Sequence, residues 1–121
     1  MANILVIDDE EDIRDFVGIV LERDGHSVME ASDGNAGMRI LEAQPIDVVI
    51  TDIIMPDKEG IETIIEIRRG NPDLKIIAIS GGGRGGGGDY LKVAKQLGAD
   101  RTFAKPLSAA GLAEAVRDLV A

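Results

Sequence analysis

The stretch "NILVIDDEEDIRDFVGIVLERDG", residues 3–25, contains a complete strand, turn and helix. Its first five residues are almost continuously apolar, which is typical of a strand covered on both faces. An acidic turn follows, and then apolar residues at helical spacing, at Ile13, Phe16, Val17, Val20 and Leu21. Gly25 marks the end of this helix. The stretch therefore predicts one βα unit.

The same alternation continues to the end of the chain. Strand-like apolar runs occur at 3–7, 27–31, 47–51, 75–79 and 101–104. Segments with helical spacing lie at 10–24, 35–43, 58–69, 89–98 and 108–120. A βα alternation repeated five times predicts a parallel sheet with helices on both faces. We expect a flavodoxin-like, doubly wound (βα)5 α/β sandwich with strand order 2-1-3-4-5, forming a single domain over residues 1–121.

Composition limits the possible function classes. A chain of 121 residues, 45% of them hydrophobic, suits one globular domain. Its net charge of −9 argues against direct binding of nucleic acid, which requires clustered Lys and Arg. The absence of cysteine excludes disulfides and thiolate metal sites. Neither a signal peptide nor an apolar run of roughly 20 residues, as a membrane helix needs, is visible. We expect a soluble, cytoplasmic domain.

Seven of the eight residues at 81–88, between the fourth strand and the fourth helix, are glycines. An interdomain linker at this point would cut the sheet in half. Gly81, Gly83 and Gly86 match the pattern G-x-G-x-x-G, but any run so rich in glycine would match it, and no Gly-Lys-Ser/Thr follows. We therefore expect a mobile switch loop, with the helix beginning late, near Asp89.

Reactive polar residues follow four of the five predicted strands. Asp8 and Asp9 end the first, Asp52 the third, Ser80 the fourth and Lys105 the fifth. Ligands of open parallel sheets bind beyond the carboxyl ends of the strands. If the first and third strands are neighbours, the three carboxylates converge and repel one another unless a cation lies among them. A set of oxygen ligands without His or Cys points to Mg²⁺.

Each residue also has a purely structural interpretation. Asp8 or Asp9, taken alone, would most simply cap the first helix, and Asp57 would cap the third. Asp52 could be a turn residue and Lys105 a solvated charge. These interpretations leave unexplained why four strands end in reactive groups at one edge.

Four segments together resemble the receiver domain of two-component response regulators. They are "VIDDEEDIR" (6–14), "DVVITDIIMPDKEG" (47–60), "IAIS" (77–80) and "FAKPL" (103–107). The resemblance covers essentially the whole chain. It implies that Asp52 accepts a phosphoryl group from a histidine kinase, a phosphotransfer protein or a small phosphodonor. It also implies that Asp9, Asp52 and the backbone carbonyl of Ile54 hold Mg²⁺, with Asp8 acting through a bound water.

The resemblance assigns three further roles. Lys105 would pair with the phosphoryl oxygens and Ser80 would hydrogen-bond to one of them. Phe103 would be the switch aromatic that turns inward as Ser80 moves. The Lys105–Pro106 peptide bond would be cis. The face formed by the fourth helix, fifth strand and fifth helix would carry the signal to an output protein.

The leading interpretation is a phosphorylatable switch that catalyses only its own phosphorylation and dephosphorylation. Because the chain ends with the fifth helix, we expect a stand-alone domain that acts through a protein partner. An aspartate-nucleophile phosphatase is disfavoured, since such enzymes need Asp two residues after the nucleophile and position 10 is Glu. A pseudo-receiver, which binds partners without phosphorylation, would lack a site residue, and none is missing.

Overall fold

The computed structural model describes residues 1–53, 59–81 and 87–121. Five parallel strands form one sheet in the order β2-β1-β3-β4-β5. The strands are β1 (Asn3–Ile7), β2 (Ser27–Ala31), β3 (Val48–Asp52), β4 (Lys75–Ser80) and β5 (Arg101–Ala104). The helices are α1 (Glu11–Arg23), α2 (Gly34–Ala43), α3 (Glu59–Gly70), α4 (Gly87–Gln96) and α5 (Ala109–Val120). The predicted alternation and strand order are confirmed.

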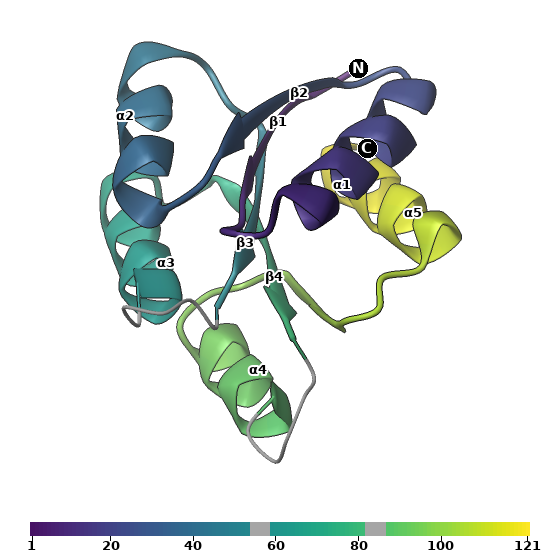
Figure 1. Ribbon diagram of the computed structural model, residues 1–121. Coiled ribbons are helices and arrows are strands. Elements are labelled where there is room, and N and C mark those ends of the chain that lie inside the picture. The colour runs from purple at the N-terminus through teal and green to yellow at the C-terminus, as the bar shows by residue number, and fades with distance from the viewer. Residues whose placement is uncertain (54–58, 82–86) are drawn as a thin grey trace.

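Helices cover both faces of the sheet, with α1 and α5 on one and α2, α3 and α4 on the other (Figure 1). Alternate residues of β1 enter different cores: Ile4 and Val6 pack toward α1 and α5, and Leu5 and Ile7 toward the other helices. A strand buried on both faces needs apolar residues at every position. This is why the predicted strands are continuous apolar runs.

Two local features show how the helices are held against the sheet. The Ser108 hydroxyl accepts a hydrogen bond from the Gly111 amide at 3.1 Å, so Ser108 caps the N-terminus of α5. At Gly37, α2 approaches β1 so closely that an added Cβ would overlap the Ile7 side chain. No helix in the described part of the chain is long and apolar enough to span a membrane.

The ends of the strands differ slightly from those predicted, and the difference places the site. β3 extends to Asp52 and β4 to Ser80, so both polar residues are the last of their strands. The Ile53 amide donates to the Ile79 carbonyl at 2.9 Å, and the Lys105 amide donates to the Ser80 carbonyl at 2.8 Å. These backbone hydrogen bonds continue the sheet past its strands and hold the polar residues at one edge.

α4 begins at Gly87, two residues before the predicted start near Asp89. The conformational entropy of glycine disfavours a helix at these positions. The helix packs against β4 and β5 and buries Ala94. The local preference of glycine therefore did not predict the first residue of α4.

Candidate functional site

Among the residues that the structure describes, four carboxylates meet at the carboxyl edge of the sheet. Asp8, Asp9, Glu10 and Asp52 each offer an oxygen, and these atoms all lie within 4.8 Å of one another. The side chains of Asp8 and Asp52 are almost completely buried, with 0% and 2% residue exposure, whereas Asp9 and Glu10 are exposed. The structure thus brings together the three aspartates that the sequence predicted to converge and adds Glu10 to them.

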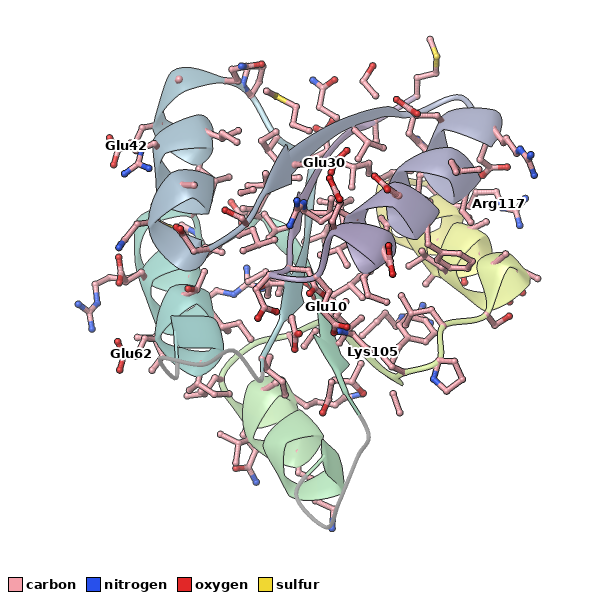
Figure 2. The ribbon with its side chains drawn as sticks, viewed as in Figure 1. Glu10, Glu30, Glu42, Glu62, Lys105 and Arg117 are labelled. Atoms are coloured by element: carbon pink, nitrogen blue, oxygen red, sulfur yellow. The ribbon has the colours of Figure 1, made fainter. Side chains whose placement is uncertain are left out.

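Lys105 supplies a positive charge at this cluster. Its Nζ lies 3.1 Å from Asp8 Oδ2, 3.1 Å from Asp52 Oδ2 and 2.7 Å from Glu10 Oε1. Figure 2 shows Glu10 and Lys105 side by side below the start of α1. The ammonium group is therefore in place to stabilise negative charge that develops at Asp52.

The ionised form of Asp8 is destabilised by its surroundings, as its raised pKa indicates. Burial, and secondarily the charge of Asp52, raises the pKa of Asp8 from 3.8 to about 6, although the Glu10 amide and Lys105 favour the ionised form. Asp8 Oδ1 accepts a hydrogen bond from the Glu10 amide at 2.9 Å. Asp8 Oδ2 is buried and, among the described residues, has no hydrogen-bond partner, although the Lys105 ammonium is near. An added cation would stabilise this carboxylate.

The pKa of Lys105 is raised as well, which for a base favours the charged form. Burial by itself would lower the pKa of Lys105, but its contacts with Glu10 and Asp8 and the charge of Asp52 raise that pKa above its ordinary value. The side chain therefore remains an ammonium ion at any physiological pH.

Two residues that support the site were not identified from the sequence. Arg14 Nη1 donates to the backbone carbonyl of Asp8 at 2.8 Å, and its Nε pairs with Glu30 Oε1 at 3.2 Å. Arg14 thereby ties the start of α1 to the end of β1 and to β2. In the sequence, Glu10 entered the argument only as a mismatch to the phosphatase pattern. Its position directly after the aspartate pair was the available indication of a role.

Ser80 and Phe103 lie on neighbouring strands. Ser80 is completely buried and pairs in register with Ala104, while Phe103 pairs with Ile79. Phe103 is half-buried and packs against the core between the sheet, α1 and α5. The Lys105–Pro106 peptide bond is cis, as expected.

The interpretation of the aspartate pair as a helix cap does not describe Asp8. Glu10 occupies the N-cap position of α1 and makes no side-chain capping hydrogen bond, and Asp8 accepts from Glu10 rather than from α1. Ile54, Asp57 and most of the glycine run lie outside the described residues.

This arrangement of acids and lysine at one edge of a 2-1-3-4-5 sheet has known relatives. Residues 4–117 match the model of the response regulator receiver domain. The chain belongs to this family.

Similarities to individual proteins are consistent with this family assignment. The receiver domain is 31% identical over 126 residues to the sensor kinase CckA of Brucella abortus, covering 98% of this chain and 12% of CckA. It thus spans only a small part of the curated sensor kinases that it matches. A receiver domain protein from Clostridium thermocellum superposes with a TM-score of 0.89 at 36% identity, covering 99% and 94% of the two chains.

A second solved structure bears on the site. The response regulator TrrA from Thermotoga maritima, in complex with Mg²⁺ and beryllofluoride, superposes with a TM-score of 0.85 at 31% identity, covering 98% and 99% of the chains. The receiver domain described here is accordingly a phosphorylatable switch of two-component signalling. Its acidic pocket fits the Mg²⁺ that receiver domains bind, because the donors are all oxygens and Asp8 Oδ2 is buried without a hydrogen bond from the described residues.

Proposed function

We propose that Asp52 is the residue that accepts the phosphoryl group. The observation that carries this proposal is the Asp52 carboxylate, almost completely buried at the end of the central strand β3, with Oδ2 3.1 Å from the Lys105 ammonium. Ligands of this sheet type bind at the carboxyl edge, next to the point where strand order reverses. Asp52 lies beside that point.

The chemistry requires a carboxylate nucleophile. An Asp52 oxygen attacks the phosphorus of the donor, a P–O bond forms, and the bond from phosphorus to the donor's leaving group breaks. The leaving group departs with that electron pair, and Asp52 becomes an acyl phosphate. Attack of water on phosphorus later releases phosphate and restores the carboxylate. Both steps make the domain a catalyst only of its own phosphorylation and dephosphorylation.

The surrounding residues position and neutralise charge. Lys105 pairs with the oxygens of the transferred group, as its ammonium already faces Asp52. Asp9, Asp52 and the Ile54 carbonyl are proposed to hold Mg²⁺, with Asp8 contributing through water. The cation, when bound, supplies neutralisation of the phosphoryl oxygens. Removing charge repulsion in this way allows a dianionic donor to approach four carboxylates.

The signal then leaves the site through two residues. Ser80, buried at the end of β4, is proposed to hydrogen-bond to a phosphoryl oxygen, and Phe103 on the adjacent strand to turn inward with it. These movements would change the face formed by α4, β5 and α5, where an output protein binds.

A sensor histidine kinase or phosphotransfer protein is the proposed donor. We also propose that residues 1–121 act as one receiver domain. A cytoplasmic location stays a prediction.

The test is incubation with acetyl phosphate and Mg²⁺, followed by mass measurement of the intact protein. Wild type should gain one phosphoryl group, and Asp52→Asn should gain none. Asp12→Asn is the matched control, because Asp12 lies exposed in the first turn of α1 and loses the same charge. Labelling of the Asp52→Asn protein at another carboxylate would contradict the assignment.

A further inference from the structure

The shortest contact of Lys105 is with a residue that the proposed chemistry does not use. Glu10 Oε1 lies 2.7 Å from Lys105 Nζ, closer than the oxygens of Asp8 and Asp52. The Glu10 side chain is 59% exposed and the Lys105 side chain 10% exposed. A solvent-facing carboxylate thus holds a largely buried ammonium group (Figure 2).

We infer that Glu10 is a positioning residue that holds Lys105 in the resting state and competes with the phosphoryl group for it. Glu10 thereby sets how readily the domain accepts and retains the phosphoryl group. This inference rests on the proposed phosphorylation of Asp52.

The three carboxylates of the described residues that contact Lys105 differ in how easily they can move away from it. Asp8 is completely buried, and its other oxygen is held by the Glu10 amide. Asp52 becomes part of the acyl phosphate, so its place beside the ammonium passes to phosphoryl oxygens. Glu10 is on the surface at the start of α1, and its long side chain can turn into water. Glu10 is therefore the contact that can open at small cost.

Charge gives the reason for that opening. A phosphoryl group brings up to two negative charges to Asp52. If Glu10 stayed beside Lys105, its carboxylate would lie next to this dianion and repel it. Release of Glu10 removes the repulsion and leaves the ammonium protons to the phosphoryl oxygens. The Glu10–Lys105 ion pair of the resting state thus makes phosphorylation less favourable, by a free energy close to that of the ion pair itself.

The size of the effect follows from the exposure of the pair. An ion pair with one solvent-exposed partner changes an equilibrium by about two- to fivefold. We expect Glu10→Gln to tighten binding of beryllofluoride, in the presence of saturating Mg²⁺, by about that factor, and to raise the rate of labelling by acetyl phosphate similarly. Glu11→Gln is the control, since Glu11 is the exposed next residue and loses the same charge. It should stay near wild type.

A conservative variant separates contact from charge. Glu10→Asp keeps the carboxylate but is one methylene shorter, so the 2.7 Å contact is weakened. If the contact holds Lys105, Glu10→Asp should shift beryllofluoride affinity in the same direction as Glu10→Gln. Wild-type affinity in Glu10→Asp would overturn the inference, because charge alone would then account for the effect of the glutamine.

Three other outcomes are distinguishable. Glu10 belongs to the cluster of carboxylates that could hold a cation. If Glu10→Gln weakens Mg²⁺ affinity by about tenfold or more while Glu11→Gln does not, Glu10 is a metal ligand, and the inference is wrong. If wild type itself neither binds beryllofluoride nor is labelled, the proposed function fails. If wild type does both and Glu10→Gln equals wild type, only the role of Glu10 fails.

Discussion

Ionised Asp8 should destabilise the fold in the absence of Mg²⁺, and Asp8→Asn should remove that cost. The pKa of Asp8 is raised from 3.8 to about 6, chiefly by burial. One pKa unit corresponds to about 1.4 kcal/mol, so the cost of ionised Asp8 at pH 7 is about 3 kcal/mol. The asparagine of the Asp8→Asn variant carries no charge, and its side-chain oxygen can still accept from the Glu10 amide, as Asp8 Oδ1 does at 2.9 Å.

The sign of the pH dependence follows from proton binding. Between pH 3.8 and about 6 the folded protein keeps a proton on Asp8 that the unfolded chain has lost. Unfolding therefore releases a proton in this range, and the contribution of Asp8 to stability decreases as pH rises. That contribution is fully present below 3.8 and is lost as the pH passes through about 6. Asp8→Asn lacks this dependence.

The measurement is urea unfolding followed by far-ultraviolet circular dichroism, with a metal chelator present. The free energy of unfolding of Asp8→Asn should exceed that of wild type by up to about 3 kcal/mol at pH 7, and the difference should shrink toward pH 4. Asp12→Asn controls for the loss of one negative charge. Mg²⁺ at pH 7 should narrow the gap, because a cation favours ionised Asp8. Parallel pH profiles for wild type and Asp8→Asn would refute the reasoning.

Two further predictions concern the cation and the packing of glycine. Mg²⁺ should raise the melting temperature of the unphosphorylated domain by mass action, and Asp9→Ala should remove most of that shift; a shift unchanged in Asp9→Ala would exclude Asp9 as a ligand. Gly37→Ala should lower the free energy of unfolding by about 1–3 kcal/mol, because its Cβ would overlap Ile7 in the core. Gly18→Ala should instead raise it by about 0.5–1 kcal/mol, because Gly18 is inside α1 and an added Cβ meets no described atom within 4 Å. Thermal unfolding that showed equal effects for the two alanines would contradict this account of α2 packing.

The elements of this protein could be predicted from the sequence because their patterns are local. Continuous apolar runs at 3–7 and 75–79 are typical of strands buried on both faces, and helical spacing fills the intervals between the strands. Parallel strands place their carboxyl ends at one edge, so polar residues such as Asp8, Asp52 and Lys105 could be expected near one another from the sequence alone. Local periodicity was sufficient to predict the strands and helices, and the rule that parallel strands end at one edge was sufficient to predict where the polar residues gather.

The contacts that adjust the site depend on tertiary structure. Glu10 and Lys105 are 95 positions apart in the chain, and no spacing in the sequence predicts that their side chains meet at 2.7 Å. The donation from Arg14 to the Asp8 carbonyl depends on the direction in which α1 leaves β1. α4 begins at Gly87 although glycine favours irregular structure, so local preference alone did not predict where this helix starts. Side-chain partners and helix ends are set by the balance of burial and charge in the assembled fold, and a one-dimensional pattern does not contain that balance.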